Sequence, residues 1–368
     1  MRMSVGVDLH KSQFTVYWRS DDGITGKHER YRTTDEGYRR FEAALQSVIE
    51  TDTPVEVAVE STGNTRYFKQ RVERCGVPVR VVNTAKFKVV TESVKKTDRH
   101  DAETLAEFLE KDMLPEAHLC SPESEELRRV IKTRKTLVET IVTVKNQLHG
   151  LLLSLGIEST RGQLQSAKER QRVKSVLAAH HVAGDAVDPL FETIDRLSQE
   201  VKKLDRVIAD MTEDDEVVQL IKTIPGAGLI TAATIRAFTD DIRRYPTAGK
   251  YAAYAGLVPW VQNSNETIHH GRITKRGPVE LRTAFVQVVL GMVRVRHRTG
   301  SYRLIERYDR LKREKGSGRS IIATARQLSE IIYRMLTDGV PFDEMKMVDP
   351  TIRRKVTEMR AAAWDAAS

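Results

Sequence analysis

The N-terminal part of the chain alternates short apolar runs with polar turns. The runs SVGVDL (residues 4–9) and FTVYW (residues 14–18) have the composition of strands, and the turn DDG before ITGKHERYRT indicates a hairpin leading to a third strand. After Thr34, which is suited to cap a helix, apolar residues recur at helical spacing in DEGYRRFEAALQSVIE. A strand (VEVAVE), a helix (NTRYFKQRVERCG) and another strand (VPVRVVN) follow.

This order of elements favours one fold class. Three adjacent antiparallel strands followed by alternating helices and strands are typical of a ribonuclease H-like α/β domain, in which a mixed sheet carries helices on its faces. We place this domain at residues 1–115.

Long amphipathic helices come next. Apolar residues recur in steps of three and four from Leu127 to Leu155, and again from Ile194 onward, after a polar interruption near residues 161–172. The pattern predicts an antiparallel hairpin or coiled-coil arm, able to dimerise, over residues 120–212. An intramolecular helical bundle is the alternative.

A mostly helical third part is predicted over residues 215–345. VVQLIKTIPGAGLITAATIRAF has the pattern of a helix-hairpin-helix, in which backbone N–H groups at Gly226 and Gly228 would bind a phosphate without contacting a base. A tight helical corner without a ligand is the alternative. Further helices are expected in TAGKYAAYAGL, from Pro278 to Arg298, from Ser301 and from Arg319, before a polar tail over residues 346–368.

The composition is that of a soluble globular protein. Of the 368 residues, 40% are hydrophobic and 30% are charged, and no apolar run approaches the roughly 18 residues of a membrane helix. The N-terminus enters strand-like sequence without a signal peptide. Cys75 and Cys120 can form neither a disulfide framework nor a CxxC metal site, so we expect a cytoplasmic protein with no membrane partner.

The net charge indicates the kind of partner that this protein binds. The formal charge is +9, and the excess falls mostly in the second half, in RITKRG, VRVRHR and RYDRLKREKGSGR. Lysine and arginine that neutralise phosphates release condensed counterions, which favours nucleic acid as the partner. A solvated, solubilising surface is the alternative.

Two carboxylates lie in strands of the first domain. Asp8 is flanked by Val7 and Leu9, which point to the opposite face of the sheet, and Glu60 ends the strand VEVAVE. A carboxylate facing the sheet needs a partner or a cation, because burying it unpaired is costly. The first and fourth strands are neighbours in a ribonuclease H-like sheet, so Asp8 and Glu60 are expected to share one end of it.

Two further carboxylates begin a helix. Asp98 and Asp101, in KKTDRHDAETLAEFL, lie three residues apart on one helical face. Taken alone, they are explained by the helix dipole, or by Asp98 acting as the cap. Taken with Asp8 and Glu60, they form a set of four carboxylates that would repel one another unless divalent cations bind, as in two-metal phosphodiester transfer.

A family resemblance joins these motifs. GVDLHKS with Asp8, VAVESTG with Glu60, and VKKTDRHDAETLAEFL with Asp98 and Asp101 resemble the DEDD signature of the Piv/MooV-type transposases and invertases, which are bridge-RNA-guided insertion-sequence serine recombinases. TIPGAGLITAATI, YAGLVP and GRITKRGPVELRTAFV resemble that family's C-terminal transposase domain. The resemblance spans nearly the whole chain. It implies a Holliday-junction resolvase (RuvC-like) N-terminal fold and four catalytic carboxylates that hold Mg²⁺ or Mn²⁺.

The same resemblance implies a serine nucleophile. Ser264 is the only serine between Pro259 and Gly271, where family members carry a serine-containing loop. The family pattern there is Ser-Ser-Gly, whereas this chain has asparagine on both sides of Ser264. Attack by a serine hydroxyl on a phosphodiester would give a phosphoserine that conserves the bond energy for rejoining.

Cations and histidines surround this serine in sequence. Arg272, Lys275 and Arg276 are suited to hold scissile phosphates and to spread charge in the transition state. His269 and His270 are either proton carriers or surface residues without a special role, and no metal-ligand pattern surrounds them.

Three functional hypotheses follow. The first is a transposase or site-specific recombinase that cuts and rejoins double-stranded donor and target DNA through Ser264, guided by a non-coding bridge RNA. The second is a metal-dependent Holliday-junction-type nuclease without a covalent serine intermediate. The third is a non-catalytic nucleic-acid scaffold.

The resemblance also implies an assembly and a location. The acids of one subunit and the serine of its partner would form a composite site in a homo-dimer or tetramer acting on two DNA segments. A bacterial or archaeal cytoplasm, in association with the nucleoid, is the expected location. Whether the enzyme transposes or inverts DNA is left open by the sequence.

Overall fold

The chain divides into two compact units, Met1–Cys120 and Ser121–Ser368. The computed structural model describes residues 2–21, 26–84, 86–87, 97–158, 164, 166–180, 187–264, 267–348 and 350–351, with the backbone alone for 261–264 and 267–270. The predicted turn at Asp22-Gly23 and most of the tail beyond residue 351 lie outside these ranges.

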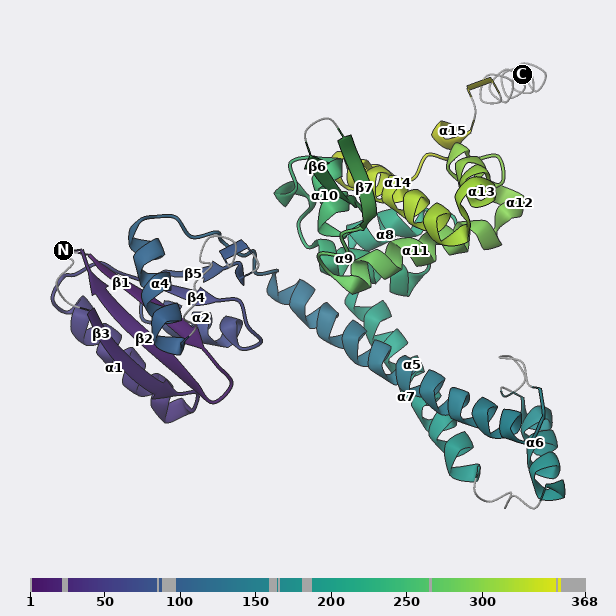
Figure 1. Ribbon diagram of the computed structural model, residues 1–368, viewed down its shortest axis with the longest axis horizontal. Helices are drawn as coiled ribbons and strands as arrows, with labels where there is room; N and C mark the ends of the chain where they lie inside the picture. The colour runs from purple at the N-terminus through teal and green to yellow at the C-terminus, as the bar shows by residue number, and fades with distance from the viewer. Residues whose placement is uncertain are drawn as a thin grey trace. The chain divides into compact units, whose positions relative to one another are not determined.

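The N-terminal unit contains a five-stranded mixed sheet (Figure 1). Its strands lie in the order β3-β2-β1-β4-β5, with β1 antiparallel to β2 and parallel to β4. The strands are β1 (Met3–Leu9), β2 (Gln13–Ser20), β3 (Gly26–Arg32), β4 (Val55–Glu60) and β5 (Val79–Val82). The predicted α/β class and the pairing of the first and fourth strands are therefore confirmed, whereas the RuvC-like assignment remains a prediction.

Helices cover both faces of this sheet. On one face α1 (Asp35–Ile49) and α2 (Thr65–Glu73) pack Phe41 and Phe68 against the core. On the other face α4 (Asp98–Glu110) packs Leu105 and Leu109 against Ala58 of β4. The predicted cap is present, because the Thr34 hydroxyl accepts a hydrogen bond from the Gly37 N–H. The alternation of β1 directs Val5, Val7 and Leu9 toward the first layer and leaves Gly6 and Asp8 facing α4.

Gly6 allows α4 to lie directly on β1. A Cβ atom at this position would be 2.0 Å from the Ala102 carbonyl oxygen and 2.6 Å from the Ala106 backbone nitrogen. Backbone atoms cannot move aside as a flexible side chain can, so only glycine fits. This close approach brings the start of α4 next to the end of β1.

The Gly6→Ala substitution is expected to separate α4 from the sheet. We predict that it lowers the free energy of unfolding by about 1–3 kcal/mol, the usual cost of overpacking a core. Urea denaturation of the full chain measures this change. Gly63→Ala is the matched control, because a Cβ at Gly63 would meet nothing within 4 Å. Equal stabilities of the two variants would contradict the close packing.

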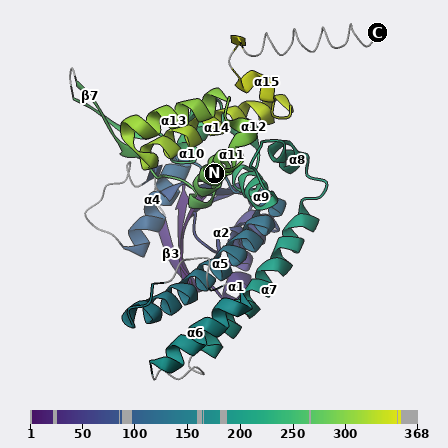
Figure 2. The same cartoon turned by 90° about the vertical axis from the view of Figure 1, so that its right-hand side faces the viewer.

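The C-terminal unit begins with a pair of antiparallel helices (Figure 2). Leu127 of α5 (Pro122–Ser154) shares a core with Ile208 of α7 (Asp188–Met211), whereas Leu148 shares a second core with Ile194. The predicted long helices are thus confirmed as an antiparallel pair within this unit. Their role as a dimerising coiled-coil arm remains a prediction.

The polar interruption predicted between these helices is partly helical. Helix α6 (Ala167–Ala179) begins inside it, after Ser166, whose hydroxyl accepts a hydrogen bond from the Glu169 N–H. Val173 and Leu177, four residues apart, bury one face of α6 in the second core. The sequence analysis did not identify this helix, because its apolar residues (Val173, Val176 and Leu177) occupy little more than one turn.

The rest of this unit is a helical bundle with one small sheet. Its core contains Phe285 and Val289 of α11 and Leu328 and Ile332 of α14. The elements are α8 (Glu216–Lys222), α9 (Leu229–Thr239), the 3₁₀ turn η3 (Ile242–Arg244), α10 (Ala248–Tyr254), β6 (Pro259–Ser264), β7 (Thr267–Ile273), α11 (Val279–Arg294), α12 (Arg296–Thr299), α13 (Arg303–Lys315), α14 (Ser317–Asp338) and α15 (Glu344–Met347).

Two predictions for this unit were wrong in detail. The helix expected from Pro278 to Arg298 ends at Arg294, and the short α12 follows after a break at Val295. The polar segment around Ser264, expected to be a loop, forms the antiparallel hairpin β6–β7. No helix in the described part of the chain is both long and apolar enough to span a membrane.

Candidate active site

The acidic site is built around Asp8, near the C-terminal end of β1. Its side chain faces α4, and the residue is only 6% exposed. His10 Nε2 lies 2.9 Å from Asp8 Oδ2 and 3.6 Å from Asp98 Oδ1. The imidazole therefore lies between carboxylates from two different elements.

The start of α4 supplies the other acids. The Thr97 hydroxyl, not Asp98, caps the helix by accepting a hydrogen bond from the His100 N–H at 3.3 Å. The alternative in which Asp98 serves as the cap is therefore wrong, and its carboxylate is available to the site. Asp101 follows one turn later, on the same side of the helix.

The electrostatics of this group favour a bound cation. Burial raises the pKa of Asp8, the adjacent His10 lowers it, and the negative charges of Asp98 and Asp101 raise it further, so that the net shift is upward. A buried carboxylate near two others is costly to ionise. A divalent cation would remove that cost by neutralising the shared charge.

Glu60 is on the same face of the sheet, at the end of β4. Val59 pairs with Val7 in the parallel register, and alternation directs Glu60, like Ala58, toward the α4 side. Thr65 fixes this strand end by donating its hydroxyl to the Glu60 carbonyl oxygen at 2.7 Å. Among the described residues, however, the ligand atoms that converge within 4.8 Å belong to Asp8, His10 and Asp98, without Glu60 or Asp101.

His10 is the residue that the sequence interpretation missed. Its signal was the two-residue spacing from Asp8, since alternate residues along an extended chain share a face. Carboxylate oxygens suit Mg²⁺ and Mn²⁺, whereas imidazole suits softer metals. The residues thus fit a divalent cation held by carboxylates, with His10 hydrogen-bonded to Asp8 and orienting it.

Ser264 lies in the other unit, at the tip of the β6–β7 hairpin. In the strand register Ser264 pairs with Thr267, the last pair before residues 265–266. Its side chain, and those of His269 and His270, lie outside the described atoms. A strand-paired position gives this residue a defined backbone orientation.

Residues 274–277, which follow the hairpin, form a fixed turn that we call the basic turn. The Thr274 N–H donates to the Val258 carbonyl at 2.9 Å and the Lys275 N–H to the Gly256 carbonyl at 3.3 Å. Arg282 Nη1 donates to the carbonyls of Ala255 (3.2 Å) and Lys275 (3.4 Å). These bonds hold the turn against the end of α10.

Of the three predicted phosphate-binding cations, Lys275 and Arg276 lie in this turn, and Arg272 precedes it in β7. Arg272, Lys275 and Arg276 are all exposed, and Lys275 adopts a φ of 53°. A non-glycine residue in that region is uncommon and needs the surrounding structure to hold it there. The cations are therefore presented to solvent from a rigid support.

The glycine turn between α8 and α9 has two different glycines. Gly226 has a φ of 89°, and a Cβ there would be 2.3 Å from the Gly291 carbonyl carbon, so Gly226 permits close packing on α11. Gly228 is exposed, precedes α9 as its N-cap and has nothing within 4 Å of a Cβ position. Phosphate binding by this turn remains a prediction.

Two family profiles match the chain in order. A transposase profile of the IS110 DEDD type matches residues 5–157, and a profile of the transposase IS116/IS110/IS902 family matches residues 218–304. The first includes all four predicted carboxylates, and the second includes the β6–β7 hairpin and the basic turn.

Similar proteins align over most of the chain. The transposase for insertion sequence element IS1328 from Yersinia enterocolitica is 25% identical over 349 residues, covering 92% of this chain and 98% of that protein. The transposase for IS1111A from Coxiella burnetii is 26% identical, covering 76% and 77%. The pilin gene-inverting protein of Moraxella bovis is 23% identical, covering 92% and 97%.

The two profiles and the aligned relatives define the class of the protein as a DNA transposase or recombinase. The chain belongs to the IS110/IS116 family of transposases, whose profiles match both units. Membership makes it an enzyme that acts on DNA, and the DEDD type implies use of a divalent metal ion.

Asp8→Asn tests whether the acidic group binds the metal. Because the pKa of Asp8 is raised in the folded state, its ionised form destabilises the fold at pH values above that pKa. We predict that Asp8→Asn raises the melting temperature at pH 7 without metal and abolishes the further increase that Mg²⁺ or Mn²⁺ gives the unsubstituted protein.

The control for this measurement is Glu107→Gln. Glu107 is on the same helix as Asp98 but forms an ion pair with Lys111. This variant should keep the whole metal-induced increase, measured by thermal denaturation of the full chain. An unchanged increase in Asp8→Asn would show that the metal binds elsewhere.

Proposed function

We propose that this transposase cuts and rejoins DNA strands through a covalent intermediate on Ser264. The observation that carries the proposal is the position of Ser264 at the tip of a strand-paired hairpin, whose second strand exposes Arg272 and is followed by a fixed turn that exposes Lys275 and Arg276. A hydroxyl nucleophile and fixed cations are the two components that phosphoryl transfer needs.

The chemistry would proceed in two balanced steps. The Ser264 oxygen attacks phosphorus and loses its proton to a base, while the bond from phosphorus to a deoxyribose oxygen breaks and that oxygen takes a proton. A hydroxyl of the second DNA strand then attacks phosphorus and loses its proton to a base, while the bond from phosphorus to the Ser264 oxygen breaks. The Ser264 oxygen takes a proton, and the new phosphodiester is complete. The cations of the basic turn bind the non-bridging oxygens as negative charge develops.

The acidic group has a supporting role in this proposal. Mg²⁺, or Mn²⁺, would polarise the phosphate and the attacking or leaving oxygen. Asp8, Asp98, Asp101 and Glu60 would hold it, with His10 fixing the Asp8 carboxylate. Since the acids and Ser264 belong to different units, we propose that they act together on DNA in a homo-dimer or tetramer.

Target choice is the remaining part of the proposal. We propose that a structured non-coding RNA, encoded next to the transposase gene, pairs with the donor and target DNA. The whole chain has a net charge of +9, and most of the excess lies in the C-terminal unit. This charge is compatible with a bound RNA. Omitting the RNA from a reconstituted reaction should abolish joining at the specific sites.

Ser264→Ala tests the nucleophile. We predict that it abolishes the covalent protein–DNA adduct on denaturing gels and lowers strand joining by at least about 10³-fold, because the attacking atom is removed. Thr267→Ala is the matched control, since Thr267 pairs with Ser264 across the hairpin and carries the nearest alternative hydroxyl in the register. An adduct that persists in Ser264→Ala and disappears in Thr267→Ala would assign the nucleophile to Thr267.

The second candidate function is a metal-dependent junction nuclease. The acidic group formed by Asp8, His10 and Asp98 within the N-terminal unit favours it, because hydrolysis by a metal-activated water would not need Ser264. Cleavage of branched DNA by Ser264→Ala at the unsubstituted rate, with no adduct in either protein, would establish the nuclease and exclude the serine mechanism.

Asp98→Asn and Asp101→Asn test the acids in both mechanisms. Each substitution keeps the side-chain shape and removes one charge, so we predict a loss of cleavage of at least about 10²-fold. Glu107→Gln should cleave normally. Normal cleavage and joining by the two aspartate variants would make the acids structural and favour the non-catalytic scaffold.

A further inference from the structure

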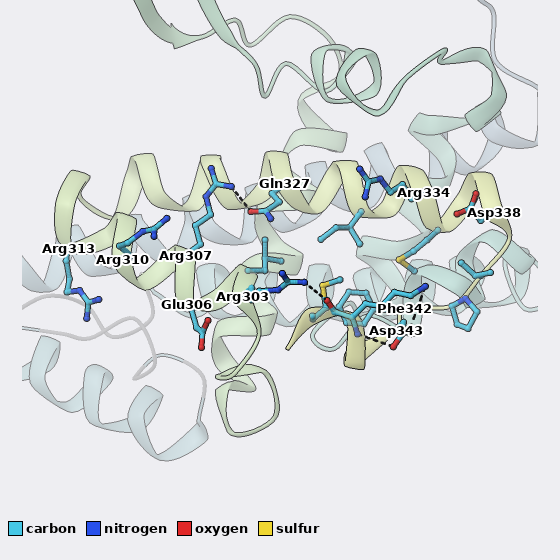
Figure 3. Close-up of a pocket in the computed structure, with 17 residues that line it drawn as sticks. Arg303, Glu306, Arg307, Arg310, Arg313, Gln327, Arg334, Asp338, Phe342 and Asp343 are labelled. Atoms are coloured by element: carbon cyan, nitrogen blue, oxygen red, sulfur yellow. Dashed lines mark hydrogen bonds and ion pairs between the residues drawn. The ribbon is translucent and has the colours of Figure 1, made fainter. Parts of the chain in front are cut away.

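A basic groove lies on the C-terminal unit, away from the basic turn in sequence. Helices α13, α14 and α15, with the segment that joins the last two, enclose a hollow of about 1010 Å³ (Figure 3). Six cations line it: Arg303, Arg307, Arg310, Arg313, Arg334 and Lys346. Three acids also line it, so the groove carries three more positive than negative charges.

The cations of α13 form a row. Arg303, Arg307, Arg310 and Arg313 follow in steps of four, three and three, which places them along one side of the helix (Figure 3). At 1.5 Å per residue, the ten residue steps from Arg303 to Arg313 span about 15 Å. All four side chains are exposed. The row is longer than a single phosphate group.

The guanidinium groups in this row are largely unpaired with acidic side chains among the described residues. Among the described residues, Arg310 has a carboxylate within 4.0 Å, that of Glu314 at 3.9 Å, and the other three have none. Arg303 Nη2 instead donates to the Lys346 carbonyl, and Arg307 Nη1 to the Gln327 side-chain oxygen, both at 3.0 Å. Neutral acceptors orient a guanidinium without cancelling its charge.

Two other arginines of this unit are held differently. Arg296 makes two hydrogen bonds to the Asp309 carboxylate, and Arg170 makes two to that of Asp195. Those cations are neutralised locally and serve the fold. The contrast marks the row on α13 as charge available to a ligand.

The groove has a firm apolar base. Leu304, Met335 and Phe342 line it and are each less than 10% exposed. The hydrogen bond from Arg307 to Gln327 links α13 to α14 across the groove (Figure 3). The cations are thus mounted on packed helices, which lowers the entropy lost when an anion binds.

We propose that this groove binds the sugar–phosphate backbone of the DNA substrate, outside the phosphodiester that reacts. Phosphates of one strand are about 3.4 Å apart along the duplex axis, so the 15 Å row matches about four phosphate steps. Arginine suits bidentate contacts to phosphate oxygens. The proposal rests on the DNA-directed function and adds a sequence-independent contact that orients the duplex.

A charge-removal variant of the full chain tests the groove. Arg307→Gln, Arg310→Gln and Arg313→Gln combined should weaken binding to a 30-bp duplex of arbitrary sequence by about tenfold or more at physiological salt. The slope of log K against log salt should fall by about 2.7, at 0.9 per lost phosphate contact. Fluorescence anisotropy over a series of NaCl concentrations measures both quantities.

The matched control removes the same charge beside the groove. Lys312, Lys315 and Arg319 are exposed, and none of them lines the groove. Changing all three to glutamine should alter the slope by less than half as much. Equal effects of the two triple variants would overturn the proposal, because only net charge would then matter. Both proteins should melt within about 2 °C of the unsubstituted chain.

Two further measurements distinguish DNA binding by the groove from RNA binding and from the serine mechanism. If the groove variant loses binding to a single-stranded or folded RNA but keeps its duplex DNA affinity, the DNA assignment is wrong. Binding is measurable in Ser264→Ala as well, so failure of the serine mechanism would leave this test intact.

Discussion

The contact between β1 and α4 is the constraint on which the acidic site depends. Gly6 removes the side chain that would separate them, and α4 therefore begins close to Asp8. The cost is a buried carboxylate whose pKa is raised by burial and by two neighbouring acids. The fold thus concentrates negative charge at one strand end, as structures that recruit divalent cations do.

The sequence predicted the elements better than their details, for physical reasons. Alternation and helical spacing identified β1, β4 and the long helices, because each buries one continuous apolar face. The hairpin around Ser264 was missed because its strands are polar and lack such a face. Pairing between backbones, which the residue types alone do not encode, makes them strands.

For the candidate site, the sequence indicated where the acids lie along the chain but not how close they come to one another. The spacing of Asp98 and Asp101 at a helix start indicated their position, but their distance from Asp8 depends on the tertiary contact at Gly6. The role of His10 was not predictable, because a histidine after a strand is common. Only the folded structure shows that His10 lies next to Asp98. Ser264 came from family resemblance and not from local physics.

The register of the β6–β7 hairpin has a consequence for the evolution of this gene. The register already shifts between Pro259 and Val261, and successive strand residues point to opposite faces. Inserting or deleting one residue between Val261 and Ser264, without a further bulge, would therefore turn the serine position to the other face. A change of two residues would restore the face. If Ser264 acts as proposed, gene copies with a one-codon insertion or deletion within residues 261–264 would therefore be inactive, even where Ser264 itself is retained.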